Sequence, residues 1–189
     1  IALRLRPPVE DRDAAFFSHA MRPTLDLEIG ETLTFRLTQT NTGGEPIEIG
    51  QALHTYFEIG DISEIDITGL EATPFIDKLE VENDGGHREP ERAPITVSAE
   101  IDRIYRGIAG PIALHDSRLG RTIEITHDGA TNAVVWNPWI EKTKRLGDMG
   151  TDDSYRTMMC IETGNVPPDA LVLAPGDTHT LTTVYRVSR

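Results

Sequence analysis

The sequence predicts an all-β protein, because short alternating apolar runs recur along its 189 residues and helical periodicity is nearly absent. Successive side chains of a strand point to opposite faces, so a run such as Leu25–Ile29 has one apolar and one polar face. Glycine and proline separate the runs, as in Gly43-Gly44 and Pro175-Gly176. Many short strands with such turns are typical of a sandwich or a barrel.

The predicted strands follow one another from the start of the chain. Ala2–Leu5 alternates, and Leu25–Ile29 and Leu33–Thr38 form a hairpin pattern. Further strands are predicted at Ile47–Ile49, around His54, and at Ile62–Ile67, Ile95–Ile101, Ile112–Leu114, Thr122–Thr126, Ala133–Trp136, Met158–Ile161, Ala170–Leu173 and Thr180–Val187. Val81–Pro94 is predicted as a polar surface loop, and only Ile140–Leu146 and Asp152–Tyr155 as short turns of helix. We expect a single β-sandwich domain over residues 1–189.

Composition limits the partners that the protein can have. Its formal net charge is −13, from 18 basic and 31 acidic residues, which argues against nucleic acid or an anionic membrane. The single cysteine excludes an internal disulfide and suits a reducing compartment. No run reaches the roughly 18 apolar residues of a membrane span, and no signal-peptide pattern is visible. We therefore expect a cytoplasmic protein, and a monomer.

His54 places a titratable ring within a run that otherwise predicts a buried strand. Alternation puts His54 and Tyr56 on one face and Thr55 and Phe57 on the other. The apolar face is expected to pack, which leaves His54 on the opposite side. A histidine of the core or its rim, satisfied by its neighbours, is the structural alternative.

Glu162 closes a second apolar run and shares its face with Met158 and Cys160, while Met159 and Ile161 point the other way. Burying a carboxylate is costly unless the group is paired, so Glu162 needs a partner or a chemical role. A solvent-facing glutamate at the end of a strand is the simpler alternative. One imidazole and one carboxylate suffice for general acid–base chemistry, in which one group takes a proton as the other gives one.

These runs, in this order, resemble the aldose 1-epimerase superfamily, and within it the hexose-6-phosphate mutarotase (glucose-6-phosphate 1-epimerase) branch. The motifs that carry the resemblance are Ala52–Phe57, Phe75–Lys78, Asp102–Tyr105, Val134–Trp139 and Cys160–Asn165. The likeness extends from about Phe16 to Arg189. The resemblance implies a large antiparallel sandwich of the galactose mutarotase-like type with its site in a concave face. Because that family is longer at its N-terminal end, we expect an upstream segment to be missing from this chain.

The resemblance also implies an activity and the residues that perform it. The expected function is an isomerase that interconverts the α and β anomers of a hexose 6-phosphate such as glucose 6-phosphate. Glu162 matches the base of the family and His54 its acid. Opening and closing the ring needs two proton transfers, and so no metal and no organic cofactor. Desolvation would make Glu162 more basic, and a nearby carboxylate would help to keep His54 charged.

Further residues are predicted to contact the substrate. Asp102 matches the family position that binds a sugar hydroxyl; alternatively it caps a strand end and pairs with Arg103. Tyr56 and Trp139 are expected to offer flat apolar faces to the sugar ring, as is Trp136, although buried aromatic residues are more often core. Asn137, between the two tryptophans, has an amide that both donates and accepts hydrogen bonds.

The expected partner is a small-molecule sugar or sugar phosphate. A sugar phosphate needs a local cluster of Arg or Lys against the acidic background. Lys78, Arg103 and Lys142 are the basic residues nearest to the matched motifs. An epimerase of a neutral aldose and a non-catalytic carbohydrate-binding sandwich remain the alternatives. Histidine spacing and the lone cysteine give no sign of a metal site.

Overall fold

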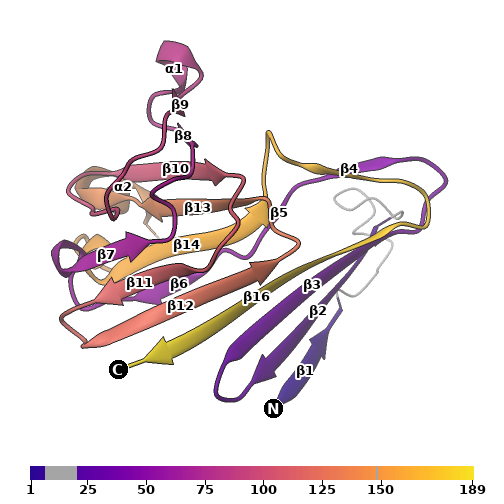
Figure 1. Ribbon diagram of the computed structural model, residues 1–189, viewed down its shortest axis with the longest axis horizontal. Helices are drawn as coiled ribbons and strands as arrows, with labels where there is room; N and C mark the ends of the chain where they lie inside the picture. The colour runs from indigo at the N-terminus through magenta and orange to yellow at the C-terminus, as the bar shows by residue number, and fades with distance from the viewer. Residues whose placement is uncertain (7–20, 148) are drawn as a thin grey trace.

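The computed structural model describes residues 1–6, 21–147 and 149–189 (Figure 1). Phe16, where the expected likeness begins, lies outside the described residues. The elements in chain order are β1 (Ala2–Leu5), β2 (Met21–Ile29), β3 (Leu33–Asn41), β4 (Ile47–Ile49), β5 (Gln51–Ala52), β6 (Tyr56–Glu58), the 3₁₀ turn η2 (Ile62–Glu64), β7 (Ile65–Thr68), β8 (Phe75–Asp77), α1 (Val81–Asp84), β9 (His87–Arg88), β10 (Ile101–Arg106), β11 (Ile112–Asp116), β12 (Arg121–Asp128), β13 (Asn132–Asn137), α2 (Trp139–Leu146), the 3₁₀ turn η3 (Ser154–Thr157), β14 (Met158–Asn165), β15 (Leu171–Leu173) and β16 (Thr178–Ser188). None of these helices is long and apolar enough to cross a membrane.

Two antiparallel sheets make up most of the described chain, which confirms the predicted all-β class. The first sheet has the strand order β1-β2-β3-β16-β12-β11-β7. The second has the order β5-β14-β13-β10-β8-β9, and β6 also pairs with β14. Figure 1 shows β7, β11 and β12 beside the second sheet, whereas β1 to β3 extend away from it as a long ribbon. Strand β14 therefore lies between β13 on one side and the short strands β5 and β6 on the other.

The core lies between the two sheets and is formed by alternate residues of their strands. From the second sheet, Met159 and Ile161 of β14 and Val135 of β13 are fully buried. From the first sheet, Leu114 and Ile125 meet them in the same cluster. Because neighbouring residues in a strand face opposite sides, the residues between these core positions lie on the other face of the second sheet. That face carries the candidate site.

The predicted hairpin is confirmed, since β2 pairs with β3 along its whole length. The helix predicted over Ile140–Leu146 is also confirmed, as α2. The prediction of strand for Ile62–Ile67 was wrong in its first half. Asp61 Oδ1 accepts hydrogen bonds from the Ser63 backbone N–H and hydroxyl, and this cap turns the chain into η2 before β7 begins.

The expected strand at Ile95–Ile101 was also wrong. Ile95 forms one isolated bridge with Ile67, and strand β10 begins only at Ile101. Ile95 and Val97 are both buried in the core, so the alternation in this segment reflects burial and not pairing. Asp102 is consequently the second residue of a strand and does not lie at a strand end.

The predicted loop Val81–Pro94 contains helix α1 and strand β9. Gly86 lies in the hairpin between β8 and β9 and has φ +72°. A Cβ at this position would lie 2.3 Å from the Asp77 carbonyl oxygen. Only glycine fits such an approach, and the Gly86 carbonyl accepts a hydrogen bond from the Asp77 N–H at 2.7 Å. Gly86 therefore allows a tight connection in which β9 pairs with β8.

Candidate active site

His54 lies in a break between two short strands. The sequence predicted strand through this position, but Leu53 to Thr55 separate β5 from β6, and both strands pair with β14. The Thr55 hydroxyl bonds to the Tyr185 hydroxyl at 2.7 Å and so faces the first sheet. His54 points the opposite way, with its side chain 51% exposed. The predicted alternation of faces therefore holds although the regular strand does not.

A close backbone approach fixes the position of the segment that leads into His54. Strand β5 pairs with β14 through Ala52 and Gly164. A Cβ on Gly164 would lie 2.4 Å from the Gln51 carbonyl oxygen, a distance that no side chain tolerates. The Leu53 N–H then donates to the Thr163 carbonyl at 3.3 Å. Gly164 thus allows the chain that carries His54 to lie directly against β14.

Glu162 lies in the middle of β14, and its side chain is only 8% exposed. Its Oε1 lies 3.3 Å from Nε2 of His54. Burial and, to a lesser extent, the nearby charge of Asp102 raise the pKa of Glu162 to about 7, against the opposing charge of Lys78. The expected desolvation of this carboxylate is therefore present, and its carboxylate and carboxylic acid forms are both accessible near neutral pH.

Asp102 lies on the same face of the sheet and is buried. Its Oδ1 is 3.3 Å from Nζ of Lys78, and its Oδ2 is 3.8 Å from Nζ of Lys142. Arg103, the partner considered from the sequence, pairs with Glu91 and lies over the ring of Phe75 instead. Pairing of Asp102 with Arg103 was therefore wrong, because adjacent residues of β10 face opposite sides.

Two aromatic side chains adjoin His54. Tyr56 stacks on the imidazole with ring centroids 4.7 Å apart and an interplanar angle of 15°, and it is 53% exposed. Trp136 meets the imidazole edge-on at 6.0 Å and Tyr56 at 6.2 Å. Lys142 reaches over the Trp136 ring, with Nζ 5.7 Å from the centroid. These rings give the site the flat apolar surfaces that the sequence suggested.

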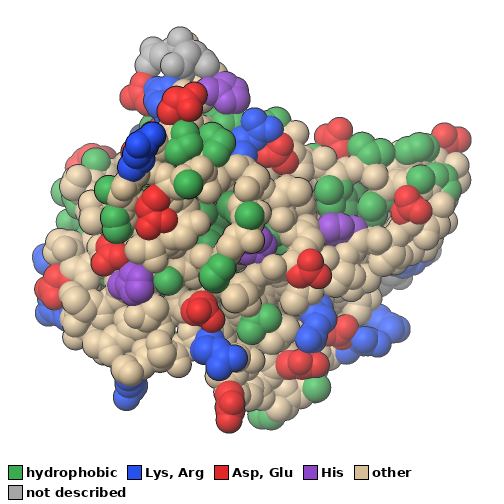
Figure 2. All heavy atoms as spheres, viewed as in Figure 1, with side chains coloured by type: hydrophobic (Ala, Val, Ile, Leu, Met, Phe, Trp, Pro, Cys, Tyr) green, Lys and Arg blue, Asp and Glu red, His purple; other side chains and the backbone are tan. Residues whose placement is uncertain are grey.

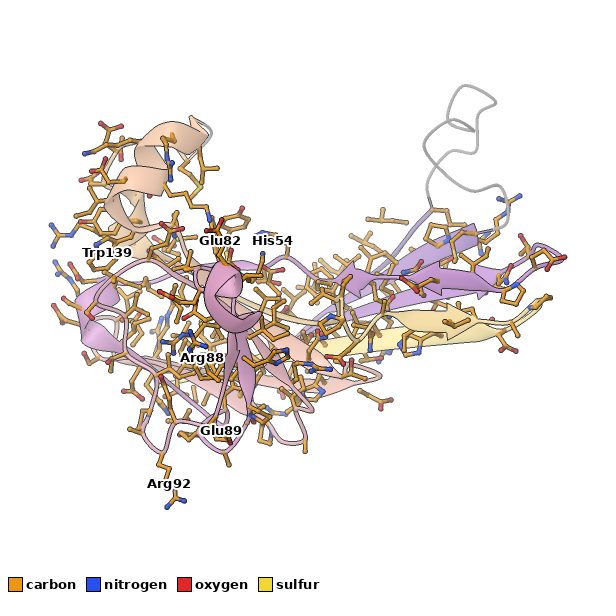
Figure 3. The ribbon with its side chains drawn as sticks, turned by 90° about the horizontal axis from the view of Figure 1, so that it is seen from above. His54, Glu82, Arg88, Glu89, Arg92 and Trp139 are labelled. Carbon is orange, nitrogen blue, oxygen red and sulfur yellow. The ribbon has the colours of Figure 1, made fainter. Side chains whose placement is uncertain are left out.

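Trp139 and Asn137 do not join this group. Trp139 packs against Tyr155 at 5.1 Å and against the core, and Figure 3 shows it apart from His54. Asn137 is fully buried: its Nδ2 donates to the Tyr155 and Met158 carbonyls, and its Oδ1 accepts from the Trp139 N–H. Both ends of the Asn137 amide therefore support the turn into α2. Neither Asn137 nor Trp139 faces the site.

The sequence indicated Lys78 and Lys142 as basic residues near the matched motifs, but it did not predict that both contact Asp102. Lys78 follows β8 and Lys142 lies in α2, so they are far apart in the chain and come together only at Asp102. Burial together with the neighbouring Glu162 raises the pKa of the Cys160 thiol well above the ordinary value. Its Sγ nevertheless lies within 4.8 Å of ligand atoms of both His54 and Glu162.

These features define an antiparallel β-sandwich with a histidine–carboxylate pair beside aromatic rings. The sequence model of the family described as aldose 1-epimerase matches residues 3–186. The chain therefore belongs to the aldose 1-epimerase family.

Similar proteins agree with this assignment. A protein of Cenchrus ciliaris, named as a candidate glucose-6-phosphate 1-epimerase, is 35% identical over 182 residues, which are 94% of this chain and 53% of that protein. A protein of Escherichia coli K12 with the same name is 32% identical over 163 residues, 86% of this chain and 52% of that protein. The chain thus spans about half the length of these relatives.

Solved structures confirm the fold. A crystal structure described as a candidate mutarotase of Salmonella typhimurium superposes with a TM-score of 0.87 at 27% identity, covering 100% of this chain and 60% of that one. A galactose mutarotase-like protein of Lactobacillus casei gives a TM-score of 0.77 at 12% identity, covering 99% of this chain and 70% of that one. The second likeness bears on the fold alone. Together they confirm the galactose mutarotase-like sandwich predicted from the sequence.

Proposed function

We propose that the protein is a hexose-6-phosphate mutarotase, an isomerase that interconverts the α and β anomers of a sugar such as glucose 6-phosphate. The observation that carries the proposal is the 3.3 Å separation between His54 Nε2 and Glu162 Oε1. Membership of the aldose 1-epimerase family and the names of the relatives support it. We extend the proposal to a small-molecule sugar as partner, to a cytoplasmic location, and to residues 1–189 as one domain.

The proposed reaction consists of two proton transfers. Glu162 as a carboxylate takes the proton of the C1 hydroxyl while protonated His54 donates to the ring oxygen, and the C1–ring oxygen bond opens. The aldehyde rotates about the C1–C2 bond, and the transfers run in reverse on closure. The C1 hydroxyl oxygen and the ring oxygen are both bonded to C1, so Glu162 and His54, whose Oε1 and Nε2 atoms are 3.3 Å apart, can reach both oxygens. Tyr56 and Trp136 would flank the ring, and Asp102 would accept a hydroxyl hydrogen bond.

An epimerase of a neutral aldose is the second candidate, and the charge balance at the site favours it. Lys78 and Lys142 are the cations that adjoin Asp102. Lys142 also pairs with Glu100 at 3.1 Å, so carboxylates already offset both cations. A phosphate dianion needs cations in excess. A phosphorylated substrate would therefore require further cations from beyond this cluster.

The test is anomer exchange measured by NMR on the full-length protein. Glucose 6-phosphate, glucose and galactose are compared, each against its uncatalysed exchange, because mutarotation also proceeds in water. Glu162→Gln and His54→Asn remove the base and the acid with little change of shape. We expect faster exchange of glucose 6-phosphate alone, lost in both variants.

The other outcomes are equally distinct. Faster exchange of the neutral sugars alone would favour the second candidate. Full activity in both variants would contradict the paired roles of His54 and Glu162. Binding of a sugar without any acceleration would replace the enzyme with a carbohydrate-binding sandwich.

A further inference from the structure

We propose that His54, Cys160 and Glu162 form a binding site for a thiophilic divalent cation such as Zn²⁺, which competes with the substrate. One ligand atom of each residue, namely a ring nitrogen, Sγ and a carboxylate oxygen, lies within 4.8 Å of the other two. The nitrogen, sulfur and oxygen donors come from the segment between β5 and β6 and from β14. Cation binding itself does not depend on the proposed function, whereas inhibition does.

Three ligand atoms within 4.8 Å of one another can close to the spacing of a tetrahedral ion. With metal–ligand distances of about 2.0 to 2.3 Å, the ligand atoms of a tetrahedral Zn²⁺ site are roughly 3.3 to 3.6 Å apart. The pair His54 Nε2 and Glu162 Oε1 is already 3.3 Å apart. The half-exposed imidazole would move from its stack on Tyr56 toward Cys160, whereas the other two side chains are held in β14. Three protein ligands would leave the fourth position open to water.

The Glu162 carboxylate has unused capacity for a cation. Its side chain is more than nine-tenths buried and lies against the site. Within the described residues, no backbone N–H or hydroxyl donates a hydrogen bond to it, and His54 is its close partner. Burying a carboxylate is costly unless a cation or hydrogen-bond donors pair with it. A cation bound at this point would satisfy its second lone pair and replace the lost solvation.

The donor set selects among metals. A thiolate and an imidazole favour Zn²⁺ and similar ions over Mg²⁺ and Ca²⁺, which prefer oxygen ligands. As the metal–sulfur bond forms, the Cys160 thiol loses its proton to solvent. The bound ion would occupy the lone pairs of both His54 and Glu162, the two groups that the proposed reaction needs. Zn²⁺ is therefore expected to inhibit and not to activate.

Co²⁺ serves as the spectroscopic probe for the site. Cys160 is the single cysteine of the sequence, so a thiolate-to-cobalt charge-transfer band reports a bond to its sulfur. We expect the band in the wild-type protein, its displacement by Zn²⁺, and its loss in Cys160→Ser. His54→Asn should bind Co²⁺ roughly a hundredfold more weakly because one ligand is gone. The matched control is His87→Asn, which removes an exposed imidazole elsewhere and should keep the band.

Inhibition is the second measurement. Anomer exchange is followed with increasing Zn²⁺, each variant relative to its own metal-free rate, and with chelator to restore activity. Cys160→Ser should need roughly a hundredfold more Zn²⁺ for the same inhibition. Absence of the cobalt band in wild type, or equal affinity for Co²⁺ in wild type and Cys160→Ser, would overturn the site. A cobalt band in a protein without epimerase activity would refute the proposed function and leave the metal site standing.

Discussion

Glu162→Gln is expected to make the protein more stable at neutral and alkaline pH while it abolishes the proposed activity. Folding raises the pKa of Glu162 from 4.5 to about 7 because the side chain is buried near Asp102. Between these values the folded protein holds the proton more tightly than the unfolded chain. The free energy of unfolding of the wild type therefore falls as the pH rises through this window. Glutamine stays neutral, so the free energy of unfolding of the variant does not fall in this way.

The size of the effect follows from the shift. A rise of about 2.5 pKa units, from 4.5 to about 7, corresponds to about 3 kcal/mol. The variant should match the wild type below about pH 4.5. The difference in the free energy of unfolding should grow from about pH 4.5 to about pH 7. Well above pH 7 the variant should be more stable than the wild type by about 3 kcal/mol. Stability would thus be lost in the wild type to keep a base with the pKa that the chemistry needs.

Urea unfolding from about pH 4 to about pH 9 measures this difference. Glu124→Gln, at an exposed position of β12, is the control and should change the free energy of unfolding by less than about 0.5 kcal/mol. A difference between Glu162→Gln and wild type that stays flat with pH would refute the reasoning. So would a wild type that becomes relatively more stable as the pH rises.

Four further substitutions separate site residues from supporting ones. Asp102→Asn removes a negative charge near Glu162, so the pKa of Glu162 should fall. In the anomer-exchange assay, the rise of kcat/KM with pH should then move to lower pH. Asn137→Ala breaks three hydrogen bonds of a buried turn and should lower the free energy of unfolding by about 2 to 4 kcal/mol in a urea titration, with KM unchanged. Trp136→Ala should raise KM in the same exchange assay, whereas Trp139→Ala should lower Tm and leave KM unchanged; the reverse would contradict the assignment of Trp136 to the site.

The residues of the proposed acid–base pair could be singled out from the sequence because both break a pattern. Glu162 interrupts the apolar run of β14, and alternation alone assigns it to the face opposite Met159 and Ile161. The same rule assigned His54 correctly even though its strand is interrupted. Their 3.3 Å contact could not be predicted from periodicity, because it depends on β5 and β6 both pairing with β14.

Asn137 and Trp139 show where residue type misleads. An amide between two tryptophans suits a sugar hydroxyl and a buried turn equally well, and composition does not distinguish the two. Here the Asn137 side chain accepts from the Trp139 N–H, and Trp139 adopts φ +56° in the left-handed region. A turn of that kind needs local hydrogen bonds to hold it. The amide supplies them, which explains why it faces inward.

The charge at the site determines which substrates these residues alone can hold. Lys78 and Lys142 both contact Asp102, and Lys142 also contacts Glu100. Above about pH 7 the ionised Glu162 adds a further negative charge, so carboxylates outnumber the two lysines. Figure 2 likewise shows acidic and basic side chains interspersed on the visible face, without a continuous basic patch.

A phosphate dianion placed at this cluster would face repulsion from the carboxylates, whereas a sugar hydroxyl would donate to Asp102 without such a cost. Recognition of a phosphorylated sugar by this protein therefore has to come from cations beyond the cluster. Preference for glucose 6-phosphate over glucose should accordingly weaken as the salt concentration rises, while exchange of glucose itself should change little.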